Sequence, residues 1–303
     1  MSTTAAFIAI VGRPNVGKSS LMNRILGAKV AIVSDKPQTT RTRIMGVLTQ
    51  EECQLVFIDT PGLHKPRTKL GESMVKAVDE SVGDVDVCVL VADASEWRAD
   101  RLPPAEEDLI ARFRKDGTPA LLALNTIDLI PDRARLLEII ASYAAKYDFA
   151  AVVPLSARSG DGVAALTDEL KKFAGEGPHF FPDDSLTDQS ERTLAAEIIR
   201  EKLLRRLTHE VPHGLAVGIE KFADRQTGEG ADLLDIEAVI YCEAESHKGI
   251  IIGKGGAMLK AVSTQARQEM ERFFGCKVNL RCWVKVKEDW RKRPGLLHQF
   301  GLD

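Results

Sequence analysis

A short stretch near the start of the chain has the residue types of a phosphate-binding loop. "GRPNVGKS" (12–19) follows an apolar run and precedes a helical pattern. Gly12 and Gly17 permit backbone dihedrals that a side chain would forbid, so successive N–H groups can surround a phosphate at a helix N-terminus. Lys18 would reach the β- and γ-phosphates of a nucleotide, and the Ser19 hydroxyl would bind Mg²⁺. The predicted P-loop consists of Gly12, Arg13, Pro14, Asn15, Val16, Gly17, Lys18, Ser19 and Ser20.

A second motif, "DTPG" (59–62), ends the apolar run "LVFID". An aspartate at a strand end is often a simple cap or turn residue. Together with an upstream P-loop, however, Asp59 is expected to hold Mg²⁺ through water, and the Gly62 N–H to contact the γ-phosphate. The two motifs therefore predict a magnesium nucleotide site.

Between these motifs lies the polar segment "SDKPQTTRTR" (34–43). Such a segment can be ordered by γ-phosphate and magnesium and released on hydrolysis. One of its threonines must then ligate the metal. Thr40 is the preferred candidate and Thr39 the competitor, because spacing alone does not separate them. The residues predicted to serve hydrolysis are Lys18, Thr40 and Gly62.

Two later motifs, "NTID" (125–128) and "SAR" (156–158), have the pattern of a guanine-reading site. Asp128 can accept hydrogen bonds from guanine N1–H and N2–H₂, whereas adenine has no donor at the corresponding edge. Asn125 would tie this loop to the P-loop, and the Ala157 N–H would meet guanine O6. Related loops usually have lysine at the position of Thr126, so we expect selectivity to be kept and affinity to be reduced. The predicted base-binding residues are Asn125, Thr126, Asp128, Ser156, Ala157 and Arg158.

The elements that position these motifs alternate in type. Over residues 6–173, apolar runs of strand length alternate with polar helical patterns, which predicts an α/β domain with a mostly parallel sheet and helices on both faces. The motifs follow strands, and open α/β sheets bind ligands at that edge. We expect a GTPase domain over 1–173, a linker over 174–190 rich in Gly, Pro and Asp, and a second domain over 191–303.

The second domain has the pattern of a small α+β unit that binds nucleic acid. An amphipathic helix (191–207) precedes two strands, a glycine turn between helices, and a strictly alternating strand (277–288). The turn carries the G-x-x-G of a KH domain, a loop that clamps about four nucleotides. The basic face of the last strand either contacts phosphate or is simply solvated. Candidate RNA-binding residues are Lys248, Gly253, Lys254, Gly255, Gly256 and Lys260.

Charge is distributed unevenly along the chain. The formal net charge is −3, but residues 248–293 contain 12 Lys and Arg against 4 Asp and Glu, which leaves about −11 elsewhere. A basic segment on an acidic body suggests a localised contact with a polyanion. The five cysteines are scattered, and the apolar runs are too short for a membrane helix. We therefore expect a cytoplasmic protein in a reducing compartment.

Taken together, these motifs resemble the Era family of bacterial, translation-factor-like GTPases across essentially the whole chain. The segments that carry the resemblance are "PNVGKSSLMNRILG", "KPQTTRTR", "DTPGLHKP", "FPDDSLTDQSERTLAAEIIREKL" and "WVKVKEDW". The resemblance implies a GTP/GDP switch with a type II KH domain that binds the single-stranded 3′ end of small-subunit ribosomal RNA. It also implies a role in assembly of the small ribosomal subunit, a monomer, and peripheral association with the inner membrane.

The resemblance also bears on how hydrolysis would run. In related GTPases a glutamine after the Asp-x-x-Gly positions the attacking water, and here that position is Leu63. Related members with a hydrophobic residue there use a potassium ion, and Asn15 matches its ligand, although a turn residue would look the same. We expect slow intrinsic turnover. The alternative is an RNA-binding assembly chaperone whose weakened nucleotide site is mainly structural, which Thr126 and Leu63 would favour.

Overall fold

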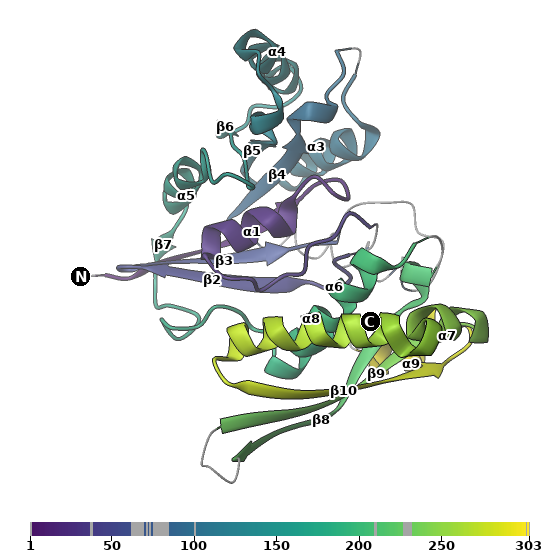
Figure 1. Cartoon of the computed structure of the whole chain (residues 1–303). Helices are drawn as coiled ribbons and strands as arrows, with labels where there is room; N and C mark the ends of the chain where they lie inside the picture. Colours follow the sequence, from purple (N-terminus) through teal and green to yellow (C-terminus); the bar gives the residue numbers. More distant parts are fainter. Residues whose placement is uncertain are drawn as a thin grey trace. The chain divides into compact units, whose positions relative to one another are not determined.

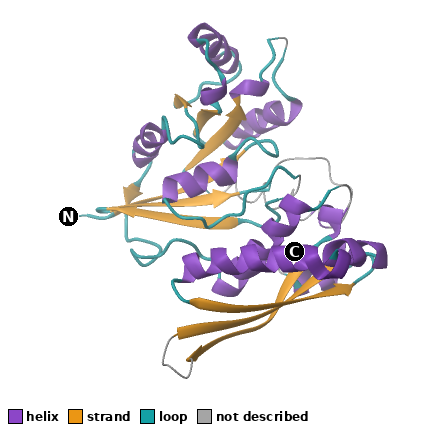
Figure 2. Cartoon of the chain, viewed as in Figure 1, coloured by secondary structure: helices purple, strands orange, loops and turns teal. Residues whose placement is uncertain are grey.

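The computed structural model describes residues 2–36, 39–61, 70, 72, 74, 85–99, 101–208, 211–226, 232–300 and 302. Its contacts divide the chain into two compact units (Figures 1 and 2). Unit 1 takes in Met1–Ala31, Thr40–Arg67 and Gly71–Asp188, and unit 2 takes in Ile32–Thr39, Thr68–Leu70 and Gln189–Asp303. The division after Asp188 falls inside the expected linker. Residues 32–39, which the sequence placed in the first domain, group with the second unit instead.

Unit 1 is built on a seven-stranded sheet with the order β2-β3-β1-β4-β5-β6, in which β7 pairs with β1 off this path. Strands β1, β3, β4, β5 and β6 are mutually parallel, whereas β2 and β7 are antiparallel to their neighbours. The mostly parallel sheet expected from the sequence is thereby confirmed. The strands are β1 (Thr4–Val11), β2 (Ile44–Gln50), β3 (Cys53–Asp59), β4 (Val87–Asp93), β5 (Ala120–Asn125), β6 (Ala151–Pro154) and β7 (Gly175–Glu176).

Helices cover both faces of this sheet. On one face Leu21 and Leu166 join a buried cluster with strand residues, and on the other face Phe113 and Ile139 do so. The strands are buried on both sides, which explains their continuous apolar runs. The first face is covered by α1 (Lys18–Leu26) and α5 (Val163–Lys171), and the second by α3 (Pro104–Asp116) and α4 (Arg133–Ala144).

Strand β2 was not predicted from the sequence; it follows the polar segment 34–43 and precedes β3. It forms an antiparallel hairpin with β3, in which Gln50 pairs with Cys53. Glu51 in the turn has a φ of 55°, a left-handed conformation unusual for a residue with a side chain. The missing glycine or asparagine explains why the sequence shows no hairpin signal there.

The expected linker is attached to unit 1. Strand β7 pairs with the start of β1, and Thr187 forms a bridge with Gly46. The Gln54 amide donates to the Phe181 carbonyl at 2.9 Å and accepts from the Phe180 N–H at 2.8 Å. The 174–188 part of the linker is therefore ordered along strands of the unit it leaves.

Unit 2 has the element order of a type II KH domain. Its sheet has the order β10-β9-β8, with β8 antiparallel and β10 parallel to β9. One face packs against α6 and α8 around a core that includes Ile199, Ile236 and Val262. The elements are α6 (Glu191–Arg206), β8 (Ala216–Gln226), β9 (Asp232–Cys242), α7 (Glu245–Ile252), α8 (Ala257–Phe274), β10 (Lys277–Val286) and α9 (Pro294–Gln299).

Helix α6 departs from a simple amphipathic pattern. The apolar residues expected on its core face, such as Leu194 and Leu203, are buried. Three consecutive charged residues, Arg200, Glu201 and Lys202, are also buried, at 2%, 0% and 6% exposure. Long charged side chains are seldom buried unless they are paired. The partners of these three side chains are therefore important for the structure of this unit.

Candidate functional site

The P-loop connects the end of β1 to the start of α1, and its backbone has the strained conformation that the glycines allow. Gly12 has a φ of 151° and Gly17 a φ of 98°, and a Cβ on Gly12 would lie 2.4 Å from the Val91 carbonyl oxygen. Asn15 also has a positive φ, of 64°. Lys18 is buried, and its ammonium donates to the carbonyls of Gly12 and Arg13 at 3.0 and 2.8 Å. Of the remaining loop residues, Val16 is buried, and Pro14 and Ser20 are half-buried.

The side chain of Arg13 points away from this loop. Its Nε donates to Glu106 of α3 at 2.7 Å, and its guanidinium also pairs with Glu96 at 3.1 Å. Glu106 is fully buried and accepts from the Tyr143 hydroxyl of α4 at 2.5 Å. Only the backbone of Arg13 can therefore contribute to phosphate binding. The arginine side chain instead fastens the loop to two helices.

Three of the predicted metal ligands meet at the ends of α1 and β3. The Ser19 hydroxyl donates to Asp59 Oδ2 at 2.5 Å and lies 3.0 Å from the Thr40 hydroxyl. Asp59 is fully buried, and its Oδ1 has no hydrogen-bond partner in the described residues. Thr39 points elsewhere, because its hydroxyl donates to the Lys36 carbonyl at 2.6 Å. The geometry thus favours Thr40 over Thr39.

Burial shifts the ionisation of the two charged groups at this point. Desolvation raises the pKa of Asp59 from 3.8 to about 6, against the opposing attraction of Lys18. Desolvation likewise lowers the pKa of Lys18 from 10.5 to about 8. A carboxylate and an ammonium group are therefore buried within electrostatic range of each other at a cost in solvation, which is common at functional sites. Gly62, the other residue predicted here, lies outside the described residues.

The base-reading loop follows β5. In the sheet, β4 lies between β5 and β1, the strand that precedes the P-loop. Asn125 donates through Nδ2 to the Val16 carbonyl at 2.8 Å, which is the tie to the P-loop expected from the sequence. Thr126 has a φ of 68°, and its hydroxyl donates to Asp93 Oδ1 at 2.5 Å. Asp128 lies in the short helix Ile127–Leu129, where its side chain is exposed and has no partner in the described residues. Its carboxylate is therefore available to a ligand.

The SAR turn differs from the expectation in one hydrogen bond. The Ala157 N–H donates to Asn125 Oδ1 at 2.9 Å, so this group is not available to guanine O6 in this structure. A buried N–H needs an acceptor, and Asn125 supplies one. The Arg158 N–H makes no hydrogen bond in the described chain and is the better candidate. Ser156 is fully buried, and its hydroxyl accepts from the Ser159 N–H at 3.1 Å.

The glycine turn of unit 2 joins α7 to α8. Gly253, Gly255 and Gly256 have φ values of 73°, 58° and 79°. A Cβ on Gly253 would lie 2.7 Å from the Met258 side chain, whereas Gly255 and Gly256 face open space. Lys254 and Lys260 are exposed, and Lys248 pairs with Glu245 at 3.6 Å. The turn therefore offers two glycine backbones and two exposed cations to a ligand.

The basic face of β10 is partly neutralised. Lys285 pairs with Glu220 at 3.1 Å, and Arg281 lies 4.0 Å from Glu237. Lys287 lies 5.8 Å from the centre of the Tyr241 ring. Trp283, on the same face, remains 42% exposed. The strict alternation expected for this strand is confirmed, but its cations are less free than a count of charges suggests.

Comparison with known proteins tests the assignment over the whole chain. A family model described as "50S ribosome-binding GTPase" matches residues 7–126, and one described as "KH domain" matches residues 210–291. The GTPase Era of Ruminiclostridium cellulolyticum is 48% identical over 302 residues, which covers 99% of this chain and 98% of the relative. The GTPase Era of Clostridioides difficile is 48% identical with the same coverage. The chain belongs to the Era family of GTPases.

Solved Era structures match the fold at similar coverage. A crystal structure of Era with MgGDPNP and nucleotides 1506–1542 of 16S ribosomal RNA has a TM-score of 0.92 and 38% identity. An Era variant from Aquifex aeolicus bound to GDP·AlF₄⁻ has a TM-score of 0.93 and 38% identity. Each match covers 99% of both chains. The expected GTPase and type II KH architecture is therefore confirmed.

Two residues that support loops around the candidate site were not predicted from the sequence. Asn23 of α1 accepts from the N–H groups of Val30 and Ala31 at 3.0 and 2.9 Å. Arg24 donates to the Ala157 carbonyl at 3.0 Å. Both are ordinary polar residues on an exposed-looking helix face. No local signal could have identified them, because their partners are distant in the sequence or lie in irregular chain.

Proposed function

We propose that this Era-family GTPase binds Mg²⁺ and GTP in unit 1 and binds the single-stranded 3′ end region of small-subunit ribosomal RNA through its KH unit. Hydrolysis of GTP to GDP would switch its affinity for RNA, and the cycle would assist assembly of the small ribosomal subunit. The observation that carries this proposal is the convergence of Ser19, Thr40 and the unpartnered Asp59 oxygen beside Lys18. A P-loop without a catalytic task has no need of a buried, partly unsatisfied carboxylate.

The residues present fit a magnesium ion. Hydroxyl and carboxylate oxygens are the ligands that this cation prefers, and Asp59 retains an oxygen without a protein partner. Ser19 and Thr40 would coordinate directly, and Asp59 would hold the ion through water. When bound, Mg²⁺ would neutralise charge on the β- and γ-phosphates.

The chain's own groups would then position the substrate for hydrolysis. The P-loop N–H groups and the Lys18 ammonium would hold the phosphates, and Thr40 would close over them. A water oxygen forms a bond to the γ-phosphorus while the bond from that phosphorus to the β–γ bridging oxygen breaks, and a proton of the water passes to an oxygen of the γ-phosphate. GDP leaves with the electron pair. Since Leu63 cannot orient water, we expect slow intrinsic turnover. If a potassium ion assists, Asn15 would be one of its ligands and the ion would supply positive charge.

The family model and the solved Era structure name different ribosomal partners. The family model matching residues 7–126 refers to the 50S subunit, whereas the solved Era structure contains 16S ribosomal RNA. The second comparison covers nearly the whole chain, including the KH unit, so we follow it. An open G-x-x-G turn between helices, with Lys254 exposed, suits single-stranded RNA.

The decisive experiment measures GTP and ATP binding and turnover in Mg²⁺ and K⁺, with and without an RNA of the 16S 3′ end. We expect GTP turnover, no ATP binding, and at least about a tenfold loss of GTP affinity in Asp128→Asn, because two charge-assisted hydrogen bonds are weakened. Asp108→Asn, an exposed change on α3, is the matched control. RNA binding without GTP turnover under any condition would support the assembly-chaperone alternative.

Peripheral association with the inner membrane and a monomeric state follow only from the family resemblance and stay predictions. None of the described helices has the length and apolar character to cross a membrane. Association of the purified protein with anionic vesicles, and its mass in solution, would test the two statements separately.

A further inference from the structure

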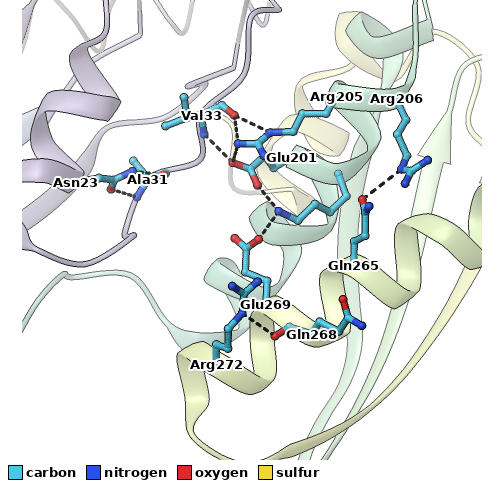
Figure 3. Close-up of polar contacts among 11 residues, drawn as sticks. Asn23, Ala31, Val33, Glu201, Arg205, Arg206, Gln265, Gln268, Glu269 and Arg272 are labelled. Carbon is cyan, nitrogen blue, oxygen red and sulfur yellow. Dashed lines mark hydrogen bonds and ion pairs between the residues drawn. The ribbon is translucent and has the colours of Figure 1, made fainter. Parts of the chain in front are cut away.

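Two buried charged residues of α6 contact backbone groups in the chain before Thr40: Glu201 contacts Val33 (Figure 3), and Arg200 contacts Thr39. The Val33 N–H donates to Glu201 Oε1 at 3.0 Å. Arg205 donates to the Val33 carbonyl from Nε and Nη2 at 3.3 and 3.1 Å, and pairs with Glu201 at 3.0 Å. Both polar backbone groups of Val33 are therefore held by one helix.

The other end of the segment is held in the same way. The Arg200 guanidinium donates to the Thr39 carbonyl and is oriented by Glu197, whose carboxylate accepts at 2.7 and 2.6 Å. Arg200 has a side-chain exposure of only 3%. The next residue in the chain is Thr40, whose hydroxyl lies 3.0 Å from Ser19. Arg200 therefore holds the residue that is bonded directly to Thr40.

The charges themselves are balanced within unit 2. Glu201 Oε2 accepts from Lys202 at 2.6 Å, and Lys202 also pairs with Glu269 of α8. Burying three consecutive charged residues costs solvation free energy that helix packing alone does not require, since apolar residues of similar size would pack as well. The hydrogen bonds to Val33 and Thr39 give these charged residues a role in addition to packing.

We propose that Arg200 and Glu201 are positioning residues for the GTPase site. They hold the backbone of Val33 and Thr39, and through the peptide bond from Thr39 to Thr40 they strengthen binding of Mg²⁺ with GTP. Neither residue touches the nucleotide. GDP lacks the γ-phosphate, and its binding therefore depends much less on Arg200 and Glu201. This inference rests on the proposed role of Thr40 as a magnesium ligand.

The test compares Arg200→Ala, Glu201→Ala and the conservative Arg200→Lys with wild type. Arg206→Ala is the matched control, because Arg206 lies on the same helix but donates to Gln265 at 3.2 Å. Two readouts are measured: the Mg²⁺ concentration for half-maximal binding of a fluorescent, non-hydrolysable GTP analogue, and amide hydrogen exchange of peptides covering residues 32–39 without nucleotide.

In the alanine variants we expect about five- to tenfold more Mg²⁺ to be required, faster exchange in this segment, and GDP affinity within about twofold of wild type. Arg200→Lys should recover part of the loss, and Arg206→Ala should match wild type. If both alanine variants retain wild-type Mg²⁺ requirement and exchange, the inference is overturned. A loss of GDP affinity equal to the loss for the analogue would also overturn it, because the effect would then be general unfolding.

Thr40→Ala separates failure of this inference from failure of the proposed function. If Thr40→Ala leaves the Mg²⁺ requirement unchanged, then Thr40 is not a ligand, and the proposed site and the role of α6 fall together. If Thr40→Ala raises the requirement and the Arg200 and Glu201 variants do not, only the positioning role is wrong.

Discussion

At the scale of single residues, Asp59 shows the conflict between function and stability most directly. Its carboxylate is fully buried, and even with the attraction of Lys18 its pKa rises to about 6. For a carboxyl group, a folded pKa above the unfolded value of 3.8 means that the charged form opposes folding. This destabilisation is absent below about pH 4, grows as the pH rises, and is complete above about pH 6.

Asp59→Asn should therefore stabilise the protein in the absence of Mg²⁺ and nucleotide. The pKa rise from 3.8 to about 6 corresponds to at most about 3 kcal/mol at pH 7.5. We expect a higher melting temperature for the variant at pH 7.5 and a stabilisation only about one third as large near pH 4.5, together with loss of Mg²⁺-dependent GTP binding. Thermal unfolding at the two pH values measures this, and an equal difference at both would contradict the assigned cause.

Thr126 is the residue at which this chain departs from the usual guanine-reading loop. Its hydroxyl is committed to Asp93, and its backbone already has the left-handed conformation. Thr126→Lys should tighten GTP and GDP binding alike, by about three- to tenfold, because the lysine stem can lie along the purine. Thr126→Ala, which removes the hydroxyl without adding a stem, is the control and should not tighten binding. Nucleotide dissociation rates measure the effect, and tightening of GTP alone would contradict it.

At the scale of elements, the α7–α8 turn depends on glycine for two different reasons. Gly253 has no room for a side chain, whereas Gly255 faces open space and has only a positive φ. Gly255→Asp should therefore leave the fold intact and place a negative charge where phosphate must approach.

We expect Gly255→Asp to weaken binding of single-stranded RNA by at least about tenfold, since it both repels phosphate and blocks close approach. Gly275→Asp is a matched control, because Gly275 also has a positive φ, of 69°, and open space around it. Fluorescence anisotropy with a labelled RNA of the 16S 3′ end measures the change. Equal effects of the two substitutions would mean that the turn does not contact RNA.

At the scale of the whole chain, positive charge is concentrated in the segment proposed to bind RNA, and the rest of the chain is acidic. The local excess of about +8 over residues 248–293 contrasts with about −11 elsewhere. If the KH turn clamps about four nucleotides, log K for RNA should fall with log salt at a slope of about −3. Lys254→Ala should reduce this slope by about 0.7. A slope near zero in the titration would exclude a phosphate-based contact.

The parts that could be read from the sequence are those encoded by neighbouring residues. Gly12 and Gly17 require a special backbone within one loop, the apolar runs of β1, β4 and β5 require burial, and the alternation of β10 requires a half-buried strand. Each of these signals arises within a few residues, because dihedral preferences and side-chain periodicity are local. The motifs, the fold class and the order of the KH elements were accessible for this reason.

Other features depended on which distant segments meet. Three features join parts of the chain far apart in sequence. They are the position of the Thr40 hydroxyl beside Ser19, the hydrogen bond from the Ala157 N–H to Asn125, and the contacts of Glu201 with Val33 and of Arg200 with Thr39. A charged residue on a helix is expected to face water, and it becomes buried only where a segment distant in sequence packs against it. Polar pairing is settled by such long-range neighbours, and it is therefore decided by the tertiary structure.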